Sequence, residues 1–141
     1  MKVPRLRSKK EEGAGLVEFA ILAPLFVMLL FGLVEFGLAL YSKGVVTNAS
    51  REGARFGVVY ATPPKTEGEI TAKVQEYLTK SGFTDTANIN IAWAEGTSGR
   101  SLSVTVAYPY HFQVLPNFVA GFTGSPDLTA KTVMFMEEQP L

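Results

Sequence analysis

One long apolar stretch, from Gly13 to Tyr41, limits what the rest of this chain can form. No charged residue lies between Glu18 and Glu35. An apolar run of about 18 or more residues is typical of a membrane-spanning helix, because a helix rises about 1.5 Å per residue and the hydrocarbon core of a bilayer is about 30 Å thick. The two glutamates are therefore expected roughly 25 Å apart along the helix, near opposite faces of a membrane. The spanning part is predicted at about residues 16–41.

The charge distribution predicts how this helix is oriented across a membrane. The chain has 13 Lys and Arg and 13 Asp and Glu, but residues 1–13 hold five of the basic residues and only two of the acidic ones. On the positive-inside rule, this basic leader stays in the cytoplasm and the rest of the chain lies outside the membrane. The remainder has more acidic than basic residues. It therefore does not look like a nucleic-acid-binding protein, which needs positive charge along one face.

The composition also excludes several kinds of site. The 141 residues include no cysteine and a single histidine, His111. Disulfides, thiolate metal sites, cysteine nucleophiles and histidine metal clusters are therefore ruled out. The sequence contains no recognisable catalytic, phosphate-binding or calcium-binding motif. We expect no enzymatic activity, no cofactor, no metal and no small-molecule substrate. His111 lies in the aromatic cluster Tyr108–Phe112, which is expected to be structural, with an adhesive or subunit-contacting surface as the alternative.

The apolar helix is expected to continue beyond the membrane, so that residues 14–61 form one helix. A small residue recurs at every fourth position near its end, and such a stripe lets another helix or a sheet approach the backbone closely. A glycine inside a solvated helix costs about 1 kcal/mol relative to alanine, so a packing role is expected. The partner is either the chain's own soluble part or another subunit. The stripe consists of Ala49, Gly53, Gly57 and Ala61.

Residues 62–141 are expected to form a small α+β head outside the membrane. Thr66 and Glu69 have the spacing of a capping box, and the apolar spacing that follows predicts a helix over about 66–80. The rest alternates with a period of two, which predicts a three-stranded antiparallel sheet. Its inward-facing residues are Ile89, Ile91 and Trp93 in the first strand and Leu102, Val104, Val106 and Tyr108 in the second. A third strand at about 127–137 follows a loop bearing Pro109, Pro116, Gly121, Gly124 and Pro126.

The start of the apolar stretch resembles a known processing site. The sequence GAGLVEF, from Gly13 to Phe19, is similar to the site of type IV and Flp-type prepilins, in which a short basic leader ends in Gly and Glu is the fifth mature residue. The longer segment GLVEFAILAPLFVMLLFGLVEFG, with the polar helix after it, resembles the TadE-like family of minor pilins and pseudopilins. This resemblance covers about residues 13–57. The first mature residue would be Ala14, where many type IV pilins have a methylated Phe.

The resemblance implies a structural subunit of a Tad (Flp) type pilus with a pilin-like fold. It implies cleavage between Gly13 and Ala14, with Glu18 and Phe19 serving recognition and assembly. In an assembled filament, Glu18 would pair with the new amino terminus of a neighbouring subunit, which would offset the cost of removing its carboxylate from water. The implied partners are a prepilin peptidase, other pilin subunits, an inner-membrane assembly platform and the lipid bilayer before assembly. Such a filament would support surface attachment or secretion.

Two other hypotheses remain open from the residues. A single-pass anchored module that binds something outside the membrane would explain the apolar run without polymerising. A secreted domain with a cleavable signal peptide would use Gly37 and Ala39 as a small-x-small site before Leu40, although a usual signal peptide has a shorter apolar region.

Of the glutamates, Glu18 could also reach water at the membrane surface. Glu35, at the outer face, is expected to meet water or Lys43.

Overall fold

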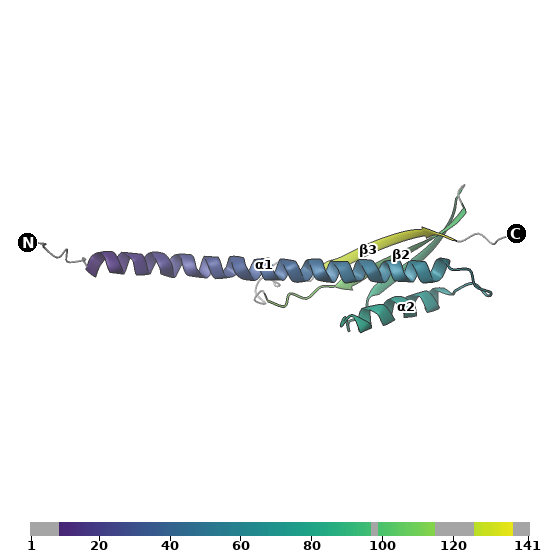
Figure 1. Cartoon of the computed structure of the whole chain (residues 1–141), viewed down its shortest axis with the longest axis horizontal. Helices are drawn as coiled ribbons and strands as arrows, with labels where there is room; N and C mark the ends of the chain where they lie inside the picture. Colours follow the sequence, from purple (N-terminus) through teal and green to yellow (C-terminus); the bar gives the residue numbers. More distant parts are fainter. Residues whose placement is uncertain (1–8, 97–98, 115–125, 137–141) are drawn as a thin grey trace, which may run out of the picture.

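The computed structural model describes residues 9–96, 99–114 and 126–136. They form one long helix, one short helix and a three-stranded antiparallel sheet, in the order α1, α2, β1, β2, β3. Figure 1 shows α1 running along the length of the molecule, with α2 and the sheet packed beside its second half only. The predicted α+β arrangement, a long apolar helix that extends into a small head, is confirmed.

Helix α1 (Lys9–Val58) is continuous and contains Pro24, yet its two halves have different surroundings. In the first half the side chains are exposed on nearly all sides. In the second half the buried positions recur every three or four residues, which is the spacing of one helix face. The opposite face carries exposed polar residues such as Asn48, Arg51 and Arg55. The buried face consists of Ser42, Val45, Val46, Ala49, Ser50, Gly53, Ala54, Gly57 and Val58.

Helix α2 (Glu67–Lys80) begins at the predicted capping box. The Glu69 amide donates to the Thr66 hydroxyl, and the Thr66 amide donates to the Glu69 carboxylate at 2.8 Å. These two bonds satisfy backbone and side-chain groups at the helix start. At the other end Gly82 adopts a φ of +87°, a left-handed conformation that favours glycine, and the Phe83 amide donates back to the Leu78 carbonyl.

The sheet has β2 at its centre, with β1 (Asn88–Gly96) and β3 (Asp127–Phe135) on either side of β2 (Gly99–Pro109). Its register pairs Ile91 with Val104 and Val104 with Thr132. Successive residues of a strand point to opposite faces, so this register places the alternating apolar residues of all three strands on one face. The two helices cover that face, and the other face is largely exposed.

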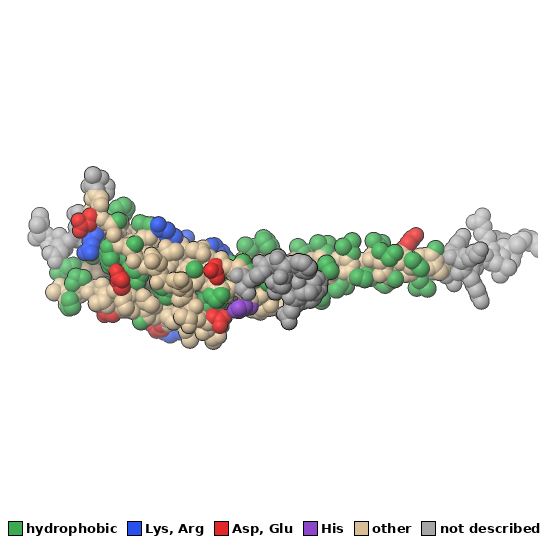
Figure 2. Space-filling model, turned by 180° about the vertical axis from the view of Figure 1, so that it is seen from behind, with side chains coloured by type: hydrophobic (Ala, Val, Ile, Leu, Met, Phe, Trp, Pro, Cys, Tyr) green, Lys and Arg blue, Asp and Glu red, His purple; other side chains and the backbone are tan. Residues whose placement is uncertain are grey.

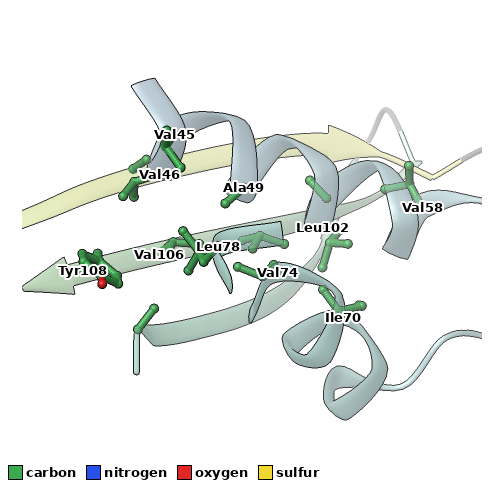
Figure 3. Close-up of a cluster of buried hydrophobic side chains, with 14 residues drawn as sticks. Val45, Val46, Ala49, Val58, Ile70, Val74, Leu78, Leu102, Val106 and Tyr108 are labelled. Atoms are coloured by element: carbon green, nitrogen blue, oxygen red, sulfur yellow. The ribbon is translucent and has the colours of Figure 1, made fainter. Parts of the chain in front are cut away.

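The core lies between the inner face of the sheet, α2 and the second half of α1. Figure 3 shows side chains from these elements converging between the ribbons. Ile70, Val74 and Leu78 of α2 are fully buried, as the helical spacing predicts. The predicted inward-facing residues of β2 are also buried, and those of β1 are half-buried at the edge. The β2 residues concerned are Leu102, Val104, Val106 and Tyr108.

Two boundaries differ from the sequence prediction. Helix α1 ends at Val58, so Ala61 lies outside the helix and does not continue the stripe of small residues along it. The prediction extended too far because the spacing of small residues does not by itself mark where a helix ends. The third strand ends at Phe135. Pro109, predicted in the loop, is instead the last residue of β2. Residue 137, and the predicted loop residues Pro116, Gly121 and Gly124, lie outside the described part of the chain.

Candidate functional site: an exposed apolar helix and its junction with the head

The first half of α1 is a long apolar surface that the chain itself does not cover. Its most apolar 18-residue window has a mean hydropathy of 2.5, and none of this window is buried inside the molecule. The helix is therefore long and apolar enough to cross a membrane. Figure 2 shows this part of the helix projecting from the head with hydrophobic side chains around it. Exposed large side chains such as Phe19, Ile21 and Phe26 are 60–70% accessible. A surface of this kind needs lipid or another apolar partner.

The predicted processing residues lie at the start of this exposed surface. Gly13, Ala14, Glu18 and Phe19 are all helical and all exposed. A Cβ atom added to Gly13 would meet nothing within 4 Å. The chain's own fold therefore brings no other described element to these residues. Any recognition of them has to come from another molecule.

The small-residue stripe, in contrast, faces the chain's own head. A Cβ atom on Gly53 would lie 2.3 Å from Cγ2 of Val74, and one on Gly57 would lie 2.4 Å from Cδ2 of Leu102. Ala49 is fully buried in the same core. The glycines thus let α2 and β2 approach the backbone of α1 more closely than any side chain would permit. Of the two partners that the sequence leaves open, the described contacts are with the head.

Glu35 is the residue whose expected environment was wrong. Only 3% of it is exposed, so it meets neither bulk water nor Lys43. The backbone amides of Gln113 and Val114 donate to its carboxylate, the latter at 2.7 Å, and the Tyr110 hydroxyl donates to Oε1. Lys43 instead donates to the backbone carbonyl of Thr129 on β3. A carboxylate with several donors can be buried at much lower cost than one without them.

This contact connects the end of the exposed helix with the end of β2. The hydroxyl of Tyr110 also lies 3.4 Å from the Glu35 carbonyl oxygen, so one tyrosine holds both the side chain and the backbone of α1 at this point. Burial, and then the adjacent Glu35 carboxylate, raise the pKa of Tyr110 to about 12. Tyr110 therefore stays neutral and keeps its proton available for this bond at physiological pH. We call Glu35, Tyr110, Gln113 and Val114 the junction.

A second group of polar contacts lies beside the junction. The Tyr108 hydroxyl accepts from the Asp85 amide at 3.1 Å, and burial raises the pKa of Tyr108. His111 is exposed, and its Nε2 lies 3.6 Å from Oδ2 of Asp85. An open cavity of about 350 Å³ lies between Tyr41 of α1, the turn after α2 and this strand end. Within the aromatic cluster the rings of Tyr110 and Phe112 pack edge to face, with their centroids 5.7 Å apart.

The described residues offer no sign of a metal centre or of an orphaned polar group. No cluster of three or more potential ligands that could hold a metal lies among them. Every buried side-chain nitrogen or oxygen in the described part has a hydrogen-bond partner. Even the buried Ser50 is satisfied, because its hydroxyl bonds to the Thr47 carbonyl and lies 2.6 Å from the hydroxyl of Thr132. On the opposite face of α1, Arg55 forms an ion pair with Glu52, three residues earlier in the helix.

Sequence reasoning identified the apolar helix but missed the junction. Glu35 and Tyr110 are 75 residues apart, and no local pattern connects two such positions. The usable signal was the combination of two unexplained features, a glutamate near the end of an apolar run and a run of aromatic residues at the end of a strand. A carboxylate in that position needs a partner, and tyrosine is an apolar side chain that carries a donor.

Comparisons with known proteins locate the similarity in α1. The family model described as TadE-like protein matches residues 13–55. No curated protein and no solved structure matches the chain. The match begins at the predicted cleavage position and covers both the exposed half of α1 and most of the half that packs against the head. Over this segment the chain is similar to TadE-like proteins, and the match confirms the family resemblance seen in its sequence.

Proposed function

We propose that this protein is a minor pilin or pseudopilin of a Tad type pilus, anchored in the cytoplasmic membrane with its head outside and then assembled through α1. The TadE-like match supports a structural rather than a catalytic role. The observation that carries the proposal is the contrast between the two halves of α1. One half is buried against the head, and the other half exposes apolar side chains on nearly all sides over the length of a membrane span.

This contrast suits a subunit that changes its surroundings. Before assembly, lipid acyl chains would cover the exposed half of α1. In a filament the same half would pack against the helices of other subunits, while the head stays outside and keeps its own core. The partners of this process would be a prepilin peptidase, other pilins and an inner-membrane assembly platform.

The processing residues give the proposal a specific chemical form. Cleavage after Gly13 would remove the basic leader and create a charged amino terminus at Ala14, one helical turn from Glu18. An ammonium group from a neighbouring subunit would offset the cost of removing the Glu18 carboxylate from water in a helical bundle. The exposure of all these residues supports this role, because both the peptidase and a neighbouring subunit have to reach them.

The direct test is the intact mass and N-terminal sequence of the protein, recovered from membranes and from the sheared surface fraction of cells that express a prepilin peptidase. We expect a new terminus at Ala14 and the processed form in the sheared fraction. Gly13→Leu should abolish processing. Gly15→Ala is the matched control, since a Cβ there meets nothing within 4 Å and the change does not touch the cleaved bond.

Other outcomes would support the competing hypotheses. An intact chain confined to membranes would favour a single-pass anchored module that does not polymerise. A terminus at Leu40 would instead indicate a secreted domain. The junction argues against the latter, because cleavage before Leu40 would remove Glu35, to which Tyr110 and two backbone amides of the head donate.

A further inference from the structure

The base of the head lies beside the apolar run of α1 rather than beyond its end. Phe112, which follows β2, lines a hollow of about 220 Å³ together with residues of the helix. The helix residues of this hollow fall inside the stretch that the sequence predicts to span the membrane. Part of the head and the outer end of the apolar run therefore occupy the same level along α1. The helix residues concerned are Gly32, Glu35, Phe36 and Ala39.

The molecular surface at this level is apolar and aromatic. Phe36, Leu40 and Tyr41 are each more than half exposed on α1, although the head is adjacent to them, and Phe112 is half-buried. We call these four residues the collar. Tyrosine is enriched where proteins cross the membrane–water interface, because its ring suits the apolar side and its hydroxyl the wet side. The collar continues the exposed surface of α1 without a polar gap.

The one acidic side chain at this level is held by hydrogen bonds within the fold. Between Glu18 and Lys43 the only charged residue in the sequence is Glu35. A carboxylate at lipid depth is costly, but the junction gives it two backbone amides and a hydroxyl as donors. The next charged residue along α1 is Lys43, two turns further on, and it donates to the Thr129 carbonyl of the head.

Helix length places the collar at the edge of the bilayer. From the predicted start of the span at residue 16, about 20 helical residues fill a hydrocarbon core of about 30 Å, which places the end of the core near Glu35. The collar then begins where the hydrocarbon core ends. A head held clear of the membrane would leave Phe36, Leu40 and Phe112 in water, which is unfavourable by about 25 cal/mol per Å² of apolar surface.

We propose that the collar inserts into the outer interface of the bilayer, so that the head rests with its base among the lipid headgroups. Glu35 is the positioning residue in this arrangement, because its bonds to Gln113 and Val114 hold Phe112 against α1 at that level. The inference rests on the proposed membrane anchoring but goes beyond it. Anchoring alone requires only the helix, whereas this proposal makes part of the head a lipid-binding surface.

The single tryptophan of the chain, Trp93, allows a direct measurement of depth. We would reconstitute the full chain into phosphatidylethanolamine–phosphatidylglycerol vesicles that contain lipids brominated at shallow or deep acyl positions, and record fluorescence quenching. In a Trp93→Phe background, Phe112→Trp reports on the collar and Phe26→Trp reports on the middle of the span. Native Trp93, on β1 of the head, is the control for a side chain outside the membrane.

We expect Trp at position 112 to be quenched several-fold more than Trp93, and more by shallow than by deep bromines. Trp at position 26 should be quenched mainly by deep bromines. If position 26 is quenched and position 112 is not, the proposal is overturned while membrane anchoring stands. If neither is quenched, anchoring itself fails. If emission at position 112 shifts to the blue only at high protein-to-lipid ratio and without quenching, a second copy covers the collar and the lipid proposal is overturned.

The positioning role of Glu35 has its own readout. Glu35→Leu should reduce the shallow quenching at position 112 and broaden its depth, because the amide donors lose their acceptor. Glu35→Gln keeps one carbonyl oxygen as an acceptor and should restore most of the shallow quenching. Native-like emission of Trp93 in parallel samples would show that the head remains folded. An unchanged depth in Glu35→Leu would overturn the role of Glu35, and the collar measurement does not depend on this variant.

Discussion

At the residue scale, the buried carboxylate of Glu35 holds α1 against the segment that follows β2 by hydrogen bonds. Glu35 is almost fully inaccessible, and the donors to its carboxylate among the described residues belong to the segment that follows β2. Glu18, with the same side chain on the same helix, is exposed. The two glutamates that bracket the apolar run therefore have opposite surroundings in the folded chain. Glu35 binds within the chain, and Glu18 remains available to other molecules.

Tyr110→Phe should weaken the junction without disturbing the core. Loss of a hydrogen bond to a charged group is expected to lower the free energy of unfolding by about 1.5–3 kcal/mol. Chemical unfolding in detergent, followed by Trp93 fluorescence, measures this change. Tyr41→Phe is the matched control, because Tyr41 is 62% exposed, and it should have little effect. Equal effects of the two changes would contradict the importance of the junction.

The raised pKa of Tyr110 also predicts a pH dependence. Burial and Glu35 disfavour the phenolate, so the folded pKa of about 12 lies above the ordinary value of 10. The corresponding stability is fully present below pH 10 and is lost as the pH rises from 10 towards 12. Between pH 10 and pH 12 the free energy of unfolding should fall more steeply for the wild type than for Tyr110→Phe. Parallel curves would exclude Tyr110 as the titrating group.

At the scale of elements, local sequence signals and close packing govern different parts of the head. The start of α2 is fixed by the reciprocal bonds between Thr66 and Glu69, which depend only on neighbours in the sequence. The crossing of α1 over α2 and β2 depends on Gly53 and Gly57, whose missing side chains leave room for distant residues. Each case yields a substitution with a matched control.

Thr66→Ala should remove the cap of α2 at a cost of about 1 kcal/mol in the free energy of unfolding. Thr71→Ala, at an exposed position inside the same helix, should be neutral or slightly stabilising. The Thr66 amide and hydroxyl lower the pKa of Glu69 from 4.5, so their contribution is present above that pH and is lost as the pH falls below it. Urea unfolding at pH 7 and pH 4 measures both effects. A Thr66→Ala variant as stable as wild type at pH 7 would contradict the role of the cap.

Gly53→Ala should destabilise the protein, although alanine favours a helix. The new Cβ would lie 2.3 Å from the stiff side chain of Val74, and overpacking a core typically costs about 1–3 kcal/mol. Gly44→Ala is the control on the same helix, because a Cβ there meets nothing within 4 Å, so it should gain up to about 1 kcal/mol. Thermal unfolding followed by circular dichroism would compare them. A Gly53→Ala variant as stable as Gly44→Ala would show that α2 can move away freely.

At the scale of the whole molecule, the chain consists of a head whose core includes the second half of α1 and an apolar half of α1 that the described residues do not cover. The buried core begins at Val45 on α1 and does not include any residue of the exposed half. The junction at Glu35 is the described contact that lies nearest to that half. The boundary between the two parts therefore falls near residue 35, several residues before the end of the apolar stretch at Tyr41.

Two truncations should separate these parts. A chain that starts at Glu35 should no longer associate with membranes through a span and should keep its junction. A chain that starts at Tyr41 lacks Glu35 and leaves the Tyr110 hydroxyl and two amides without their acceptor, so it should be less stable by about 1–3 kcal/mol. Membrane flotation and thermal unfolding measure the two effects. Equal stability of the truncated chains would place the boundary after the junction.

The sequence determined the elements of this protein because their signals are local. The uncharged run from Glu18 to Glu35 specifies an apolar helix, Thr66 and Glu69 specify the start of α2, and the alternation around Val104 specifies a strand with one buried face. The processing residues Gly13 and Ala14 and the assembly role of Glu18 remain predictions, since they concern other molecules.

Only the tertiary structure decided which distant residues meet. It set the small-residue stripe against α2 and β2, ended α1 at Val58 before Ala61, and buried Glu35 against Tyr110 and two backbone amides. These contacts join segments dozens of residues apart, and they depend on how the head folds back along α1. Periodicity and capping act over one or two helical turns, so they cannot specify where a carboxylate finds its donors or how closely two backbones approach.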